Sequence, residues 1–181
     1  MKFKPALGFT LVELLVVIAI LAILAIAAFV LINPLESRRK GQDSVRLSDL
    51  ANLNNAINVA VQESTQSGSQ ILCTGSSYPC TGDSFTGTRS NNGTGWVRVN
   101  LGSAQVVTVP TLPRDPVNTS ALHYTYCADN PGNVDAWEIA ATLESNTYQN
   151  LMTNDGGNDT ARYEIGSNLT LIAASGGSCT Y

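Results

Sequence analysis

The chain contains a single histidine, His123, and none of its cysteines form a CxxC pair. Nucleophilic catalysis usually needs a histidine beside the nucleophile, and structural zinc usually needs four closely spaced cysteines and histidines. The sequence also lacks a Gly-x-Ser-x-Gly elbow, a phosphate-binding loop and a dinucleotide-binding fingerprint. These absences argue against several large enzyme classes, and the sequence predicts a protein that is not an enzyme.

Basic residues are also scarce, because 10 lysines and arginines stand against 14 aspartates and glutamates. The resulting net charge of −4 argues against a nucleic-acid partner, which would need a basic surface for phosphate contacts. A length of 181 residues supports one globular domain besides any membrane anchor.

What the sequence does contain is a long apolar run, from Phe9 to Ile32, in which Glu13 is the one charged residue. As a helix this run would span about 36 Å, which exceeds the hydrocarbon core of about 30 Å. A secretory signal peptide has a shorter apolar region, of about 7–15 residues, and small residues at its cleavage point. A plain anchor explains the length but not a carboxylate at the start of the span, which is costly in a membrane.

The segment Gly8-Phe9-Thr10-Leu11-Val12-Glu13, preceded by a short basic leader, resembles the processing site of type IV pilins and of type II secretion pseudopilins. The resemblance implies that a prepilin peptidase cuts after Gly8 and methylates the new amine of Phe9. It also implies a homo-oligomeric helical filament, built at a membrane platform with an assembly ATPase, in which Glu13 of one subunit meets the amine of another.

The expected organisation is a leader peptide (1–8), a transmembrane and filament-core helix (9–34), an amphipathic helix (35–64) and a β-rich globular head (65–181). Pro34 is expected to bend or interrupt the helix. Apolar residues at spacings of three and four predict one buried stripe on the amphipathic helix, formed by Leu47, Leu50, Leu53, Ile57 and Ala60 or Val61. Three charged residues, Asp43, Arg46 and Asp49, are expected to lie off this stripe and to face water or neighbouring subunits.

The segment after Ser64 is rich in turn residues, since thirteen of the fifteen glycines lie from Gly68 onward. Alternation of apolar residues within it predicts short strands, and the lack of helical patterns between them favours an antiparallel sheet. The predicted strands lie at 96–101, 106–109, 122–126, 137–143 and 169–172. The fold class is therefore α+β, and a long helix packed on such a sheet is the pilin fold.

Four cysteines lie beyond the apolar run, at Cys73, Cys80, Cys127 and Cys179, and they allow three pairings. Two disulfides in an oxidising space outside the membrane are expected. The preferred pairing is Cys73 with Cys80 and Cys127 with Cys179, and the second bond would tie the C-terminal tail to the sheet as in many pilins.

The cysteines and the resemblance predict a single-pass protein of the cytoplasmic membrane, with the amino terminus on the cytoplasmic side and the head on the outer side. After assembly the subunit would lie in a cell-surface pilus or a periplasmic pseudopilus. The charges that flank the span, taken alone, weakly favour the opposite orientation. Two lysines precede the span and three basic residues, Arg38 to Lys40, follow it, and the more basic flank normally lies on the cytoplasmic side.

One loop, Thr153 to Asp159, combines two aspartates, two asparagines and two glycines. Oxygen ligands on a flexible backbone suit calcium, so Asn154, Asp155, Asn158 and Asp159 form a candidate calcium site. The alternative is an ordinary Asn/Asp/Gly turn.

The sequence predicts a filament-forming structural subunit. A pseudopilin for protein secretion is the first alternative, and a minor pilin for adhesion or DNA uptake is the second. The segment Leu112-Pro113-Arg114-Asp115-Pro116 resembles a loop-to-strand segment of the major pseudopilin, although Val117 to Thr119 lack the aromatic and glycine usual there.

Overall fold

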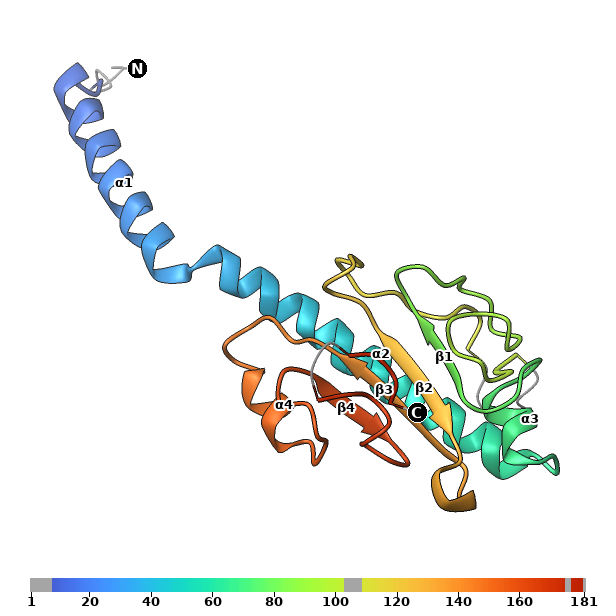
Figure 1. Ribbon diagram of the computed structural model, residues 1–181. Helices are drawn as coiled ribbons and strands as arrows, with labels where there is room; N and C mark the ends of the chain where they lie inside the picture. Colours follow the sequence, from blue (N-terminus) through green and yellow to red (C-terminus); the bar gives the residue numbers. More distant parts are fainter. Residues whose placement is uncertain (1–7, 103–108, 175–176, 181) are drawn as a thin grey trace, which may run out of the picture. The chain divides into compact units, whose positions relative to one another are not determined.

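The computed structural model describes residues 8–102, 109–174 and 177–180. The chain divides into two compact units, the first ending at Arg38 and the second running from Arg39 to Tyr181. In chain order the elements are α1 (Leu11–Ile32), α2 (Pro34–Glu63), α3 (Gly68–Leu72), β1 (Cys80–Asp83), β2 (Thr125–Asp129), η1 (Pro131–Asn133), β3 (Ala136–Ala141), α4 (Gln149–Asn154) and β4 (Tyr163–Gly166) (Figure 1).

The two long helices are separated at Asn33, as the presence of Pro34 predicts. Asn33 has a left-handed backbone (φ 42°, ψ 76°) and closes α1. Pro34 then opens α2 at the first helical position, where the missing N–H is not needed. The Asn33 Oδ1 accepts a hydrogen bond from the Glu36 backbone N–H at 3.3 Å. The local sequence therefore ends one helix and starts the next within a single residue.

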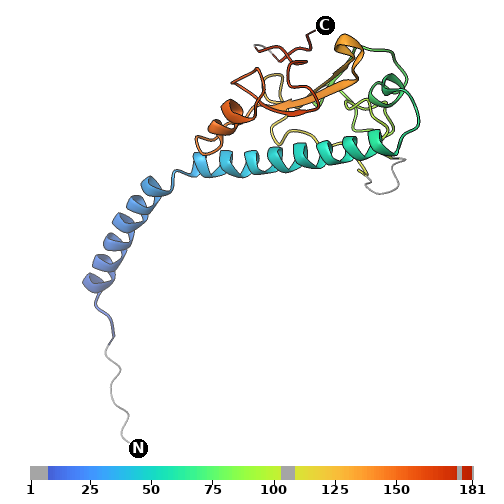
Figure 2. The same cartoon turned by 90° about the horizontal axis from the view of Figure 1, so that it is seen from below.

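The sheet of the second unit has four antiparallel strands in the order β1-β2-β3-β4. The register places Cys127 between Thr81 and Glu138, and Ile139 between Tyr126 and Ile165. The α+β fold class with an antiparallel sheet is thereby confirmed. Figure 2 shows α2 running along one face of this sheet.

The main core lies between α2 and that face. Leu50, Leu53 and Ile57 of α2 are buried against Tyr126 and Ile139 of the central strands. The opposite face is covered by the C-terminal tail, and a smaller apolar cluster forms there from Cys127, Ala136, Ala140, Leu171 and Ile172. Both faces of the sheet are therefore buried, which explains why β3 is buried at all six positions.

Two of the predicted strands are present with shifted ends, as β2 and β3. The strand predicted at 96–101 is wrong, because this segment forms only an isolated bridge between Asn92 and Asn100. Trp96 and Val97 are both buried, so the alternation there reflects packing of an irregular loop on the core. A Cβ on Gly82 would lie 2.0 Å from the Trp96 carbonyl oxygen, which shows how closely this loop approaches β1.

The other two predicted strands, at 106–109 and 169–172, have different outcomes. Residues 169–172 form a single bridge, between Ile172 and Cys179, instead of a strand. Most of the segment predicted at 106–109 lies outside the described residues. The edge strands β1 and β4 were not predicted, because Cys80–Asp83 and Tyr163–Gly166 are short and contain few apolar residues.

Candidate functional site

The N-terminal segment places Glu13 at the start of α1. Gly8, Phe9 and Thr10 precede the helix and are exposed, and no atom lies within 4 Å of a Cβ built on Gly8. Thr10 is the N-cap, and its Oγ1 accepts the Glu13 N–H at 3.3 Å. The Glu13 carboxylate accepts in return from the Thr10 N–H at 2.9 Å and from its hydroxyl at 2.8 Å. This reciprocal capping box fixes the helix start and leaves the Gly8–Phe9 junction accessible just outside it.

The described apolar side chains of α1 are exposed. Leu11 to Ala28 form a stretch long and apolar enough to cross a membrane, and none of it is buried in the monomer. Large apolar side chains along it are exposed, by between 48% at Val16 and 81% at Leu11. A helix that is apolar on all sides is stable only in lipid or among other apolar helices. This segment therefore requires a membrane or a helical bundle.

In the second unit, a buried charge cluster joins α2 to two loops. The Arg46 guanidinium binds Asp115 through two bonds, from Nε at 2.6 Å and from Nη2 at 3.0 Å. Its Nη1 lies 2.7 Å from the Asp43 carboxylate and 2.9 Å from that of Glu144. Arg46 and Asp43 are 0% exposed, and Asp115 is 4% exposed. Asp43 also accepts the Glu144 and Ser145 backbone N–H groups, so its charge holds that loop to α2.

Asp43, Arg46 and Asp49 were expected to face water or neighbouring subunits. This prediction is wrong for Asp43 and Arg46, which are buried. Asp43, Arg46, Leu50, Leu53 and Ile57 follow each other at spacings of three and four, so the buried stripe begins with a charged pair. Sequence reasoning classified residues by polarity and missed this continuation, although the spacing alone would have revealed it.

Asp49, the third charged residue, is half-buried on the same helix. Its carboxylate accepts the Tyr124 hydroxyl at 2.9 Å. Burial raises the pKa of Asp49 and also that of the Tyr124 phenol. Burial acts in the same direction on Asp115, but hydrogen bonds from Arg46 and from two backbone N–H groups outweigh it and lower the pKa of that carboxyl. The cluster therefore keeps Asp115 ionised beside Arg46.

A second buried acid pair lies on the opposite face of the sheet, beneath the C-terminal tail. Glu138 of β3 and Glu164 of β4 are 0% and 2% exposed. Glu138 Oε2 accepts the Leu171 and Ile172 N–H groups at 2.8 and 2.9 Å. Glu164 Oε2 accepts the Asp159 N–H. Burial, together with the neighbouring Glu164, raises the pKa of Glu138 to about 9, so Glu138 is protonated at neutral pH.

This raised pKa predicts that alkali destabilises the second unit. Below pH 4.5 Glu138 is protonated both folded and unfolded, so its contribution to stability is complete. Between 4.5 and about 9 only the folded state retains the proton, so the free energy of unfolding falls by roughly 1.4 kcal/mol per pH unit. Urea unfolding between pH 5 and 9 measures this slope. Glu138→Gln, whose amide oxygen can accept from the tail as Glu138 does, should flatten this slope; an unchanged slope would contradict the raised pKa of Glu138.

Two disulfides crosslink the second unit. Cys73 is bonded to Cys80, with their Cα atoms 5.9 Å apart, and links the end of α3 to β1. Cys127 is bonded to Cys179, with a Cα separation of 5.7 Å, and holds the tail over the sheet. This connectivity is the preferred one of the three that the sequence allows, and it leaves no free cysteine among the described residues.

The candidate calcium residues lie around the end of α4. Asp155 accepts the Gly157 and Glu164 N–H groups, and Asp159 accepts the Ala161 N–H and lies 3.6 Å from the Arg162 Nε. The Asn154 amide donates to the Asn150 carbonyl oxygen. Within the described residues, no three histidine, cysteine or acidic side chains converge on a common point. Calcium would have to compete with these internal bonds, and its binding here stays a prediction.

Melting of the full chain in detergent, with and without millimolar calcium, tests that prediction. A bound cation should raise the melting temperature by mass action, and Asp155→Asn should abolish the increase. An unchanged melting temperature would identify the loop as a turn stabilised by its own side chains.

Comparison with protein families matches residues 4–29 to the prokaryotic N-terminal methylation motif. No match was found among curated proteins or among solved structures. The matched residues include the Gly8–Phe9 junction, the Thr10–Glu13 capping box and most of α1. This motif is the signature of type IV pilins and pseudopilins, and the α+β architecture with its long N-terminal helices is consistent with the pilin fold.

Proposed function

We propose that the chain is a structural subunit of a type IV pilus-like filament, cut between Gly8 and Phe9 by a prepilin peptidase and assembled through its N-terminal helix. The observation that carries this proposal is the isolated apolar surface of α1, interrupted by a single carboxylate five residues after Gly8. Before assembly, α1 holds the subunit in the cytoplasmic membrane with the head outside. In the filament, the Phe9–Ile32 helices of many subunits bury one another. A membrane platform and an assembly ATPase drive the transfer.

Glu13 has a distinct role in this assembly. Cleavage creates a positive amine on Phe9, and an incoming subunit must bring that amine into an apolar bundle. Burial of an unpaired charge is costly, whereas two opposite charges about 4 Å apart attract by roughly 4 kcal/mol at an effective dielectric of 20. Glu13 is the only acidic side chain between Phe9 and Ile32, so Glu13 of a neighbouring subunit is the proposed partner.

Processing gives the first test of this proposal. The mature protein should begin at Phe9 with a methylated amine, because the junction is exposed and lies outside the capped helix. Gly8→Val should block the cut by placing a branched side chain at the peptidase site. Mass spectrometry of the membrane-held protein measures both. A native terminus at Met1, or after Asn33, would overturn the assignment.

A pseudopilin is the second candidate, and Leu112–Pro116 is the segment that favours it. In the structure this segment carries Asp115 into the buried cluster with Arg46, and its Leu112 is fully buried. The two candidates share membrane insertion and processing, and they differ in where the fibre lies. Electron microscopy of intact source cells distinguishes a cell-surface pilus from a short periplasmic fibre.

A further inference from the structure

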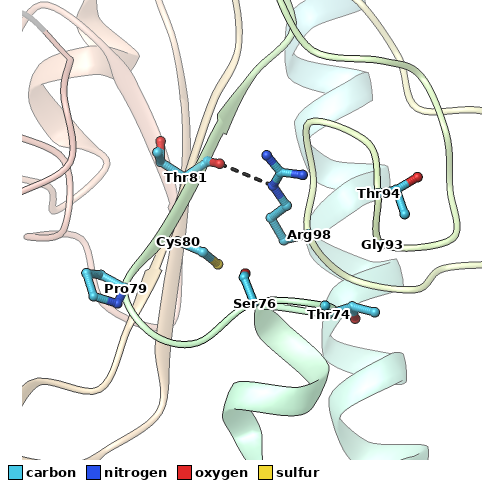
Figure 3. A pocket seen from close by; sticks show the side chains of 9 residues that line it. Thr74, Ser76, Pro79, Cys80, Thr81, Gly93, Thr94 and Arg98 are labelled. Atoms are coloured by element: carbon cyan, nitrogen blue, oxygen red, sulfur yellow. Dashed lines mark hydrogen bonds between the residues drawn. The ribbon is translucent and has the colours of Figure 1, made fainter.

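A pocket with a volume of about 390 Å³ opens on the second unit beside the first disulfide. Three short segments line it: the turn after α3, the start of β1 and the loop that carries Arg98 (Figure 3). Its size lies at the lower end of the range for small-molecule sites, roughly 300–1,000 Å³. A ligand of one or two small rings would fill it.

The walls of this pocket are held in place by covalent and backbone contacts. The Cys73–Cys80 disulfide ties the turn after α3 to β1. The Thr74 N–H donates to the Arg98 carbonyl oxygen at 2.8 Å, which joins the turn to the third segment. Gly93 packs so closely on Thr74 that an added Cβ would lie 2.5 Å from the Thr74 Cβ. The pocket is therefore preformed, and a ligand would not have to order it.

Arg98 is the only charged side chain among the described residues that line the pocket. Its Nε donates to the Thr81 carbonyl oxygen at 3.3 Å, and Figure 3 shows the guanidinium between β1 and the loop of Gly93 and Thr94. Among the described residues, its two terminal nitrogens have no hydrogen-bond partner. These nitrogens are free to bind an anionic oxygen, and a guanidinium binds a carboxylate through two parallel bonds.

Three hydroxyl groups that line the pocket already donate their protons to other protein atoms, so they complement Arg98 by accepting hydrogen bonds. Thr74 Oγ1 donates to the Gln70 and Ile71 carbonyl oxygens. Ser76 Oγ donates to the Cys73 carbonyl oxygen, and Thr94 Oγ1 to the Asn92 side chain. The Thr74, Ser76 and Thr94 hydroxyl oxygens therefore offer lone pairs to a ligand and no proton. The pocket combines one cationic donor with several neutral acceptors.

A ligand that binds both the cationic donor and the neutral acceptors must carry an acidic oxygen and several hydroxyl donors on one small molecule. We propose that this pocket binds an acidic sugar, with its carboxylate on Arg98 and its hydroxyls donating to the Thr74, Ser76 and Thr94 oxygens. A neutral sugar lacks the group for Arg98, and a simple carboxylate lacks the hydroxyls. The proposal does not rest on the filament function, since the pocket lies wholly in the second unit.

The experiment measures binding of glucuronate to the full chain by saturation-transfer NMR, in a detergent without a sugar or a charged headgroup. Glucose and acetate are the comparison probes, and a glucuronate-containing oligosaccharide distinguishes a chain end of a polysaccharide from the free sugar. Glucuronate should bind at least tenfold more tightly than either comparison probe. Arg98→Gln should weaken it by about 10- to 100-fold, as expected when a charge-assisted hydrogen bond is lost.

Arg114→Gln is the matched control, because Arg114 also donates a single 3.3 Å bond to a backbone carbonyl oxygen but lies outside the pocket. It should leave the affinity unchanged. Ser76→Trp places a large side chain at an exposed wall residue and should abolish binding without changing the melting temperature. Absent glucuronate binding, equal binding of acetate, or an equal effect of Arg98→Gln and Arg114→Gln would each overturn the proposal.

Discussion

Cells that carry Glu13→Leu should contain processed, membrane-held subunit and no fibres. The substitution leaves the Gly8–Phe9 junction intact and makes α1 more apolar, so insertion and cleavage should proceed. Assembly should fail, because the Phe9 amine would enter the bundle of helices without an opposite charge, and burial of an unpaired charge costs several kcal/mol. Immunoblotting of membranes and electron microscopy of the same cells measure the two effects separately.

Two further variants separate the intersubunit charge from the capping box. Glu13→Gln retains an oxygen that can accept from Thr10, and glutamine is accepted at this position of a capping box, but the charge is lost. Thr10→Ala retains the charge and removes the N-cap, which costs about 1 kcal/mol of helix stability. We expect Glu13→Gln to lack fibres and Thr10→Ala to form them. Normal fibres in Glu13→Gln would show that Glu13 serves only to cap its own helix.

Arg46→Met should destabilise the second unit by about 3–5 kcal/mol, the range for breaking a buried ion pair on one side. Methionine fills much of the volume but leaves the Asp43 and Asp115 carboxylates buried without their cation. The loop at Glu144 and Ser145 is held to α2 through Asp43, so it should loosen as well. Urea unfolding of the full chain in detergent measures the loss, and hydrogen exchange at Ser145 reports the loop.

Two comparisons make this prediction specific. Arg114→Gln removes an exposed arginine with one backbone hydrogen bond and should change stability by less than about 0.5 kcal/mol. Adding Asp115→Asn to Arg46→Met removes one of the two buried carboxylates left without a cation, and it should recover part of the lost free energy of unfolding. A loss in Arg46→Met no larger than that in Arg114→Gln would contradict a structural role for the buried cluster.

The sequence predicted those features that depend on long, uniform patterns. The apolar run and its single carboxylate define α1, Pro34 separates it from α2, and alternation at Tyr126 and Ile139 locates the two central strands. Each of these signals extends over several residues, so tertiary contacts do not override it. The disulfide connectivity was not determined by spacing alone, since four cysteines permit three pairings.

Features that depend on contacts between distant segments were not predictable in this way. Arg46 is buried because Asp115 and Glu144 approach it from loops 69 and 98 residues further along the chain. Likewise, Glu138 is buried because the C-terminal tail crosses the sheet and donates two backbone N–H groups to it. A polar residue in a sequence pattern is normally assigned to the surface, and only the fold reveals the partners that permit its burial.

The most direct test of the filament proposal is mass spectrometry of fibres sheared from the source cells. The account predicts that the purified fibres contain this chain as a structural subunit, beginning at an N-methylated Phe9 and carrying both disulfides. Fibres from which the chain is absent, together with a membrane form that retains residues 1–8, would contradict it.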